Sequence, residues 1–238
     1  MRSKIHSWLG SFFALFRLII QRPIPKKQII DTLQAFNPIQ ASDIPALTRI
    51  GGLGDGGYWL PDDFEGIEAV FSPGVGDVAN FEMHFAQNGV PVFLVDHTVD
   101  HPPVFHELFR FQKLRLAPET HPGFSVNLTD WVAECAPQGD LILQMDIEGD
   151  EYEALLTSSE ELLARFRLIA IEMHDISSVA TKSGRALLAS TLRLIHKTHR
   201  LVFQAHNDSC RRLYVKGIRI PNCLELTFLR RDRFNQND

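Results

Sequence analysis

The strongest chemical signal in the sequence is a glycine-containing turn between an apolar run and a helical pattern. Residues 70–79 read VFSPGVGDVA, so Gly74, Gly76 and Ala79 have the spacing Gly-x-Gly-x-x-Ala. Glycines at such a turn let the backbone approach a bound nucleotide or nucleoside closely. Asp96 ends the next apolar run, 20 residues after Gly76, where an acid in Rossmann-like folds binds ribose hydroxyls. The pattern predicts a nucleoside-type ligand, with an ordinary strand-to-helix turn as the alternative.

A second signal is the segment LILQMDIEGDEYE at residues 141–153. Its apolar run leads into Asp146 and Glu148, which places two carboxylates at the carboxyl edge of a sheet, where doubly wound folds bind ligands. Acids in a first helical turn complement the helix dipole, so a structural role is expected for Asp150, Glu151 and Glu153. Asp146 is the better functional candidate, because an acid that ends an apolar strand is costly to desolvate without a partner.

Short β-rich runs alternate with helical stretches from about residue 50, which predicts an α/β fold with a mostly parallel sheet. Seven strands are expected, near Ala69–Ser72, Val90–Val95, Leu114–Ala117, Leu141–Asp146, Leu168–Met173, Leu201–His206 and Leu224–Leu229. Helices are expected near Lys27–Phe36, Ala79–Asn88, Val104–Phe111, Thr129–Ala136, Glu151–Ser158 and Ser183–Thr198. Residues 207–222 leave no room for a crossover helix, so the sheet should close with an antiparallel strand.

The amino-terminal segment differs from the rest of the chain in charge and hydropathy. The apolar run Trp8–Ile20 is too short, and too interrupted by Arg17, to span a membrane. Residues 1–30 contain six basic residues and no acid, and residues 1–27 are interpreted as an amphipathic helix on an anionic membrane surface. The alternative is that its apolar arc docks on the protein's own body or on a second subunit. Residues 28–48 are expected to form a connector, and residues 49–238 the main domain.

Composition and charge set further limits. The chain has 238 residues, of which 45% are apolar and 22% charged, as in soluble globular proteins. The net charge is −5, but residues 31–238 contain 18 basic and 29 acidic residues, a net charge of −11, so no nucleic-acid partner is expected. The odd set Cys135, Cys210 and Cys223 predicts neither a disulfide framework nor a structural zinc site. A reducing compartment is therefore expected, in the cytoplasm or at the inner face of a membrane.

Seven segments form a recognisable succession along the chain: Ser72–Gly76, Phe81–Glu82, Asp96–Thr98, Leu128–Trp131, Gln144–Gly149, Ile171–His174 and Glu225–Leu229. Together they resemble the FkbM-like family of S-adenosylmethionine-dependent methyltransferases. The resemblance covers roughly residues 49–231, and the Asp-x-Glu-Gly and Glu-x-His motifs are its more specific parts. The chain departs from the wider class at Ser72 and Pro73, because an acid usually stands before the glycines.

The resemblance implies a Rossmann-like seven-stranded methyltransferase sheet, mostly parallel with an antiparallel closing strand and with helices on both faces. It places Gly74 and Gly76 against S-adenosylmethionine and Asp96 at the ribose. Asp146 would lie beside the methionine part of the cofactor and the methyl acceptor, with Glu172 and His174 across the pocket. Members mostly methylate hydroxyl groups of sugars, glycolipids or other natural products, so a small-molecule or glycan acceptor is expected.

In the mechanism that this implies, His174 would accept the proton of the acceptor hydroxyl while Asp146 or Glu172 orients the histidine. These three residues could also hold a hard divalent cation, but separate strand ends do not establish a coordination geometry, and no metal is expected. The glycine-rich segment Arg49–Tyr58 is expected to form a hairpin turn, with a loop folded over the cofactor as the alternative.

Two rival functions are also compatible with the sequence. The spacing of Gly74, Gly76 and Asp96 satisfies the fingerprint of an NAD-dependent oxidoreductase as well, although no second domain would bring a substrate to the nicotinamide. The other rival is a catalytically silent methyltransferase-like scaffold at a membrane.

Overall fold

The computed structural model describes residues 24–39, 44–54, 56–135, 137–207 and 210–234. The amphipathic helix expected over residues 1–27 lies almost entirely outside these ranges. Within the ranges, no helix is both long enough and apolar enough to cross a membrane.

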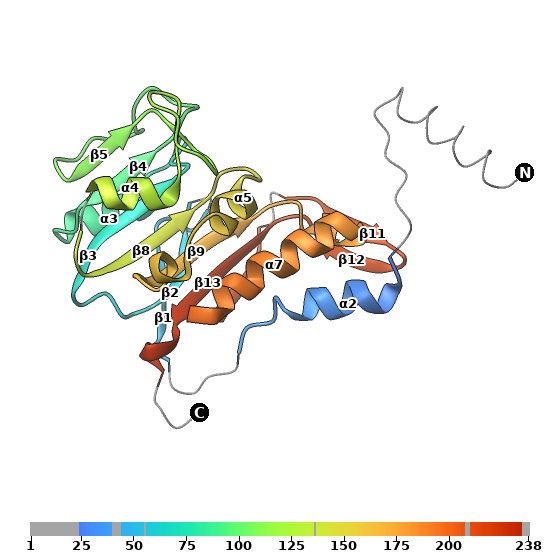
Figure 1. Ribbon diagram of the computed structural model, residues 1–238. Coiled ribbons are helices and arrows are strands. Elements are labelled where there is room, and N and C mark those ends of the chain that lie inside the picture. Colours follow the sequence, from blue (N-terminus) through green and yellow to red (C-terminus); the bar gives the residue numbers. More distant parts are fainter. Residues whose placement is uncertain (1–23, 40–43, 55, 136, 208–209, 235–238) are drawn as a thin grey trace, which may run out of the picture.

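A mixed sheet of seven strands forms the centre of the molecule (Figure 1). Its strands are β3 (Ile67–Pro73), β4 (Val92–Val95), β5 (Phe109–Gln112), β8 (Asp140–Met145), β9 (Phe166–Met173), β10 (His199–His206) and β13 (Leu224–Arg230). They follow one another across the sheet in the order β10-β13-β9-β8-β3-β4-β5. The pairs β3–β4, β3–β8, β4–β5 and β8–β9 are parallel, whereas β13 is antiparallel to both β9 and β10. This confirms the expected α/β class and the antiparallel closing strand.

Alternate residues of the central strands point into two separate apolar cores. In β8, Leu141, Leu143 and Met145 belong to one core and Ile142 belongs to the other. The first core is covered by α4 (Leu128–Cys135), α5 (Glu151–Leu156), α6 (Glu160–Leu163) and α7 (Lys182–Thr198). The second core is covered by α3 (Asn80–Gln87) and by the hairpin of β1 (Leu47–Ile50) and β2 (Tyr58–Pro61). Successive side chains of these strands point to opposite faces, and both faces are apolar. The sheet must therefore be covered on both faces, as expected.

One expected strand and one expected helix are wrong. The helix predicted over Val104–Phe111 is replaced by a loop and by β5, which pairs with β4 at the edge of the sheet. The strand predicted at Leu114–Ala117 is reduced to β6 (Arg115–Leu116), which pairs with β7 (Ser125–Val126) in a separate small sheet. The aromatic residues Phe109 and Phe111 alternate with polar residues, so the segment suits a half-buried edge strand better than a helix.

The segment expected to be a connector is packed against the domain. Its helix α2 (Lys26–Gln34) confirms the helix expected near residues 27–36, and it lies beside α7 (Figure 1). Ile29 and Phe36 are buried in the first core, and the Ile39 amide donates a hydrogen bond to the Leu201 carbonyl oxygen. Burial of these side chains fixes the segment to the sheet.

The cysteines depart from the pattern on which the expectation of a reducing compartment was based. Cys210 and Cys223 form a disulfide, while Cys135 is free. The two bonded residues flank the hairpin of β11 (Arg212–Val215) and β12 (Ile218–Pro221), whose antiparallel pairing brings its ends together. An odd cysteine count excludes complete pairing but does not exclude one bond. The support that unpaired cysteines gave to a reducing compartment is therefore removed.

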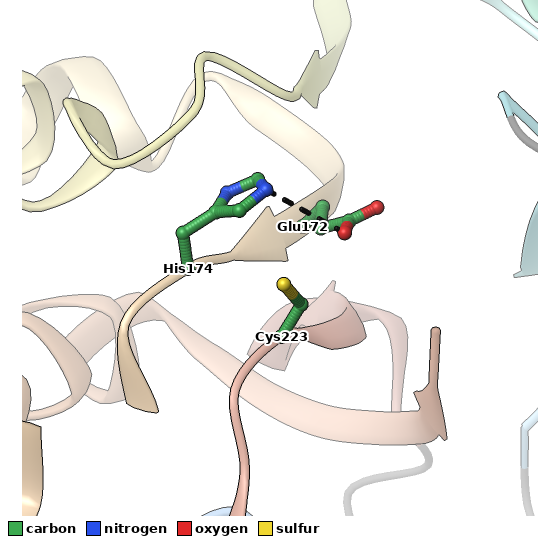
Figure 2. A group of neighbouring side chains, drawn as sticks. All are labelled: Glu172, His174 and Cys223. Atoms are coloured by element: carbon green, nitrogen blue, oxygen red, sulfur yellow. Dashed lines mark ion pairs between the residues drawn. The ribbon is translucent and has the colours of Figure 1, made fainter. Parts of the chain in front are cut away.

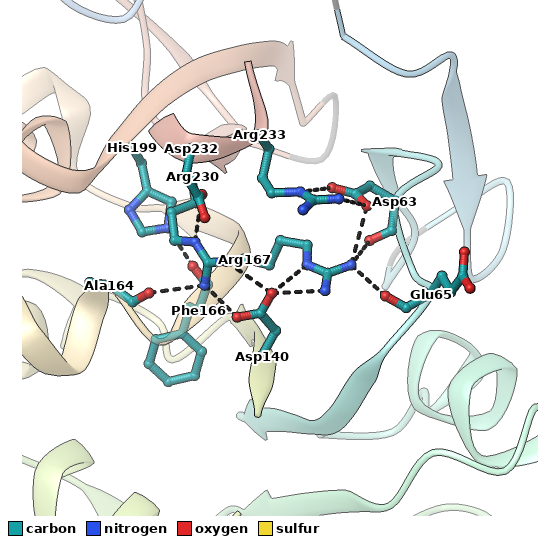
Figure 3. A network of polar contacts seen from close by, with 10 residues as sticks. All are labelled: Asp63, Glu65, Asp140, Ala164, Phe166, Arg167, His199, Arg230, Asp232 and Arg233. Atoms are coloured by element: carbon teal, nitrogen blue, oxygen red, sulfur yellow. Dashed lines mark hydrogen bonds and ion pairs between the residues drawn. The ribbon is translucent and has the colours of Figure 1, made fainter. Parts of the chain in front are cut away.

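The amino-terminal edge of the central strands is held by a network of ion pairs and hydrogen bonds (Figure 3). Arg167, near the start of β9, lies between the carboxylates of Asp140 and Asp63. Arg230, at the end of β13, donates to both oxygens of Asp140. Nearby, the His199 ring contacts the Phe166 carbonyl oxygen at 2.7 Å. The network connects four strands at the edge opposite the candidate site described next.

Candidate functional site

A cavity of about 310 Å³ opens at the carboxyl ends of β3, β4 and β8. This volume is at the lower end of the range for small-molecule sites. Its walls are formed by Gly56, Gly74, Val75, Gly76, Asp77, Val78, Glu82, Val95, Asp96, His97, Thr98, Leu114, Arg115, Leu116, Gln144, Asp146, Ile147, Glu148 and Asp150. The glycine turn, Asp96 and Asp146 therefore meet at one cavity, as the sequence predicts.

The two glycines of the turn have different surroundings. Gly74 has a φ of +89°, and a Cβ built on it would lie 1.6 Å from the Asp146 carbonyl oxygen. Only glycine lets the turn after β3 approach the end of β8 this closely. Gly76 also has a positive φ, of +50°, but no atom lies within 4 Å of a Cβ built on it. Gly74 therefore joins two strand ends, whereas Gly76 leaves its side of the turn open.

Asp96 holds the turn in place at the end of β4. Its Oδ2 accepts a hydrogen bond from the Gly76 amide at 2.9 Å. Its Oδ1 accepts two from Thr98, from the amide at 2.7 Å and from the hydroxyl at 2.6 Å. Burial alone would raise the pKa of Asp96, but these hydrogen bonds from Thr98 and Gly76 outweigh it and lower the pKa. The carboxylate is therefore ionised at neutral pH.

A chain of buried polar side chains includes Glu82 and Gln144 of the cavity wall. The Ser72 hydroxyl lies 2.5 Å from Glu82 Oε1 and 2.6 Å from Gln144 Oε1. The Gln144 amide in turn donates to the Tyr58 hydroxyl at 3.2 Å. A serine hydroxyl has one proton, so it cannot donate to both acceptors. A proton on Glu82 satisfies the chain, because Glu82 then donates to Ser72 and Ser72 donates to Gln144.

Electrostatics favours the same proton on Glu82. Burial raises the pKa of this carboxyl group to about 7, and the hydrogen bond that Ser72 would donate to the ionised form only partly opposes that effect. Glu82 belongs to a segment that carries the family resemblance, which implies no role for it. The structure places it next to the position before the glycines, where Ser72 stands in place of the usual acid.

We expect Glu82→Gln to change the pH dependence of stability. The folded-state pKa of about 7 lies above the ordinary value of 4.5, so wild-type stability falls as pH rises from about 4.5 through about 7. Glutamine stays neutral and can still donate to Ser72. The variant should therefore gain about 2–3 kcal/mol relative to wild type between pH 5 and pH 8, measured by urea unfolding. Exposed Glu107→Gln is the control, and an equal stability difference at both pH values would contradict the assignment.

His174 is fixed by a residue that the sequence did not identify as functional. Glu151 is fully buried at the start of α5, and its Oε1 lies 2.9 Å from His174 Nδ1. The same oxygen accepts hydrogen bonds from the amides of Ile147 and Gly149. Glu151 thus orients the ring and shapes the loop after β8. The helix-dipole role expected for this acid explains its position in the helix but not its burial.

The other ring nitrogen of His174 faces three carboxylates. Nε2 lies 3.4 Å from Glu148 Oε2, 3.6 Å from Glu172 Oε1 and 3.9 Å from Asp146 Oδ1. Figure 2 shows Glu172 and His174 side by side at the end of β9, with Cys223 next to them. Burial raises the pKa of Asp146, and Glu172 raises it further. Burial opposes a charge on His174, but Glu151 and the other carboxylates outweigh it and raise the pKa of the ring. The carboxylates around His174 therefore favour positive charge at Nε2 of the ring.

One further prediction about this region can be compared with the structure. The segment Arg49–Tyr58 connects β1 to β2, which confirms the hairpin, and its Gly56 also lines the cavity. Arg49 shapes the loop by donating to the carbonyl oxygens of Gly52 and Gly54. Asn207, directly after β10, donates to both carboxylate oxygens of Glu172. The cavity and the His174 cluster therefore share Asp146 and Glu148, while Glu172 and His174 lie outside the cavity wall.

Comparison with known proteins adds no relative to these observations. No protein-family model matches the chain, and no curated protein matches it either.

Proposed function

We propose that the chain is an S-adenosylmethionine-dependent methyltransferase that methylates a hydroxyl of a sugar, glycolipid or other natural product. The observation that carries the proposal is the cavity in which the glycine turn, Asp96 and Asp146 meet. On this proposal, the nucleoside site and the polar groups that would bind a hydroxyl acceptor lie together at one edge of the sheet.

The order of the strands supports the finer assignment of a Rossmann-like methyltransferase sheet. The chain crosses from β3 outward to β5 in one direction and from β8 to β9 in the other. The change of direction lies between β3 and β8, and ligands of open α/β sheets bind at such a switch point. The cavity lies at this point.

The residues present fit the ribose of such a cofactor. An ionised carboxylate offers about four acceptor positions, and Asp96 uses three of them for Gly76 and Thr98. One position on Oδ2 is left for a ribose hydroxyl. Beside Asp96, the open side of Gly76 leaves room for a ligand to lie against the backbone.

The reaction itself would depend on orientation. S-adenosylmethionine supplies an electrophilic methyl group on a sulfonium ion. Asp146 and Glu148, on the wall of the cavity, would hold the acceptor hydroxyl in line with that group. His174 and Glu172 would act from outside the wall, through Asp146, and this is the largest change from the arrangement expected from sequence.

The rival functions are distinguished by ligand binding. Titration calorimetry with S-adenosylmethionine, S-adenosylhomocysteine and NAD should show binding of the first two alone. Tight binding of NAD alone would favour the oxidoreductase. A silent scaffold would bind the cofactor but release no S-adenosylhomocysteine with any hydroxyl acceptor.

We expect Asp96→Ala to weaken S-adenosylhomocysteine binding by roughly fivefold to 150-fold, because hydrogen bonds to a charged group contribute about 1–3 kcal/mol. The same variant also loosens the glycine turn, so the test needs a ligand that lacks the ribose hydroxyls. Dideoxyribose analogues should lose much less affinity when Asp96 is replaced. Thr98→Val is the matched control, since it removes one bond to Oδ1 and leaves Oδ2 intact. Equal losses for both ligands would show that Asp96 only supports the turn.

A further inference from the structure

The neighbours of His174 determine which ring nitrogen can act as a ligand. A carboxylate only accepts hydrogen bonds, so the contact with Glu151 Oε1 at 2.9 Å places a proton on Nδ1. In the neutral ring, Nε2 then carries the lone pair. Histidines that bind metal ions are typically held in this way, with a carboxylate bound to the second nitrogen.

The distances around Nε2 suit ligands of one shared metal ion better than hydrogen-bond partners. Asp146, Glu148 and Glu172 place oxygens 3.4–3.9 Å from Nε2, beyond hydrogen-bonding distance. Two ligands about 2.1 Å from one ion are about 3.0 Å apart at right angles and about 3.9 Å apart at 135°. The observed separations fall within that interval.

A buried oxygen that lacks a hydrogen-bond donor in the described part of the chain lies at the same position. Asp146 Oδ1 is buried and has no hydrogen-bond partner among the described residues, although it is the oxygen that faces Nε2. A buried carboxylate oxygen without a donor is costly. Glu148 and His174 provide donor atoms within 4.8 Å of one another and of Asp146.

We propose that Asp146, Glu148 and His174, with Glu172 beside them, form a binding site for a divalent transition-metal ion such as Mn²⁺ or Zn²⁺. One imidazole nitrogen with carboxylate oxygens suits such ions, whereas Mg²⁺ prefers oxygen ligands alone. Cys223 is close to Glu172 and His174 (Figure 2), but its sulfur is bonded to Cys210 and provides no thiolate. The metal site does not depend on the proposed methyl transfer, since none of its ligand residues requires a bound cofactor.

The test is titration of Mn²⁺ into the full-length, chelator-treated protein with the disulfide intact and no cofactor. One ion should bind per chain, more tightly than Mg²⁺. Pulsed electron paramagnetic resonance of the bound Mn²⁺ should show coupling to one imidazole nitrogen, and His174→Ala should abolish this coupling. Absence of Mn²⁺ binding, or an unchanged nitrogen coupling in His174→Ala, would overturn the proposal.

Glu148→Gln gives a second test that does not put folding at risk, because this side chain is 87% exposed. We expect it to weaken Mn²⁺ binding at least tenfold. Asp77→Asn is the matched control, since Asp77 is an exposed carboxylate on the wall of the same cavity but outside the cluster. Equal affinities of wild type and Glu148→Gln, or equal losses in both variants, would place the ion elsewhere. Failure of the cofactor to bind would leave these results unchanged.

Discussion

The Gly74→Ala variant is expected to lose about 2–5 kcal/mol of stability together with its affinity for S-adenosylmethionine. The added Cβ would lie 1.6 Å from the Asp146 carbonyl oxygen and 2.7 Å from its carbon, so the ends of β3 and β8 would have to separate. Forcing an extra carbon into a packed site costs about 1–3 kcal/mol. A left-handed backbone costs a non-glycine residue roughly 1–2 kcal/mol more.

Gly76→Ala is the matched control for this prediction. Gly76 also has a positive φ, but a Cβ built on it would enter open space. The variant should therefore lose only the roughly 1–2 kcal/mol of stability that a left-handed backbone costs alanine. Urea unfolding of both variants measures the difference, and calorimetry measures cofactor binding where the protein remains folded. Equal losses of stability in the two variants would mean that the contact with Asp146 does not hold the strands together.

The Arg167→Ala variant is expected to lose about 3–5 kcal/mol of stability, the usual cost of removing one partner from a buried ion pair. The Arg167 side chain is only 7% exposed and pairs with both Asp63 and Asp140. It also donates to the carbonyl oxygens of Asp63 and Glu65, which would lose this donor (Figure 3). The loss should appear in urea unfolding and leave the distant cavity intact.

Arg233→Ala provides the comparison, because Arg233 pairs with the same Asp63 from a side chain that is 38% exposed. A pair of that kind contributes about 0–1 kcal/mol. Similar losses in both arginine variants would show that burial does not distinguish the two pairs.

Strands buried on both faces were predictable from the sequence, because their apolar runs are nearly continuous. All eight residues of β9 are buried, and the run FRLIAIEM identifies it as a strand without tertiary information. The edge strand β5 has only one buried residue, Phe109. Two short segments, near Phe109 and near Leu116, show a similar pattern, so the pattern alone does not decide which of them reaches the sheet.

The candidate site was predictable where it depends on strand ends and turns. Asp96 and Asp146 each follow an apolar run, so their position at one edge of the sheet follows from the parallel arrangement. Glu151 and Glu82 lie on helices, and their burial depends on how α5 and α3 pack against the sheet. Local sequence contains no signal for that packing. The disulfide was missed because the cysteine count says nothing about which two residues a hairpin brings together.

The position of β13 has a consequence for protein synthesis. This strand lies between β9 and β10, yet both of them leave the ribosome before it does. While residues 174–223 are being made, one edge of the apolar strand β9 has no backbone partner, and an open apolar edge is a template for association with other chains. The nascent chain is therefore most exposed to misassembly in this interval, which ends only when residues 224–230 become available to fill the gap.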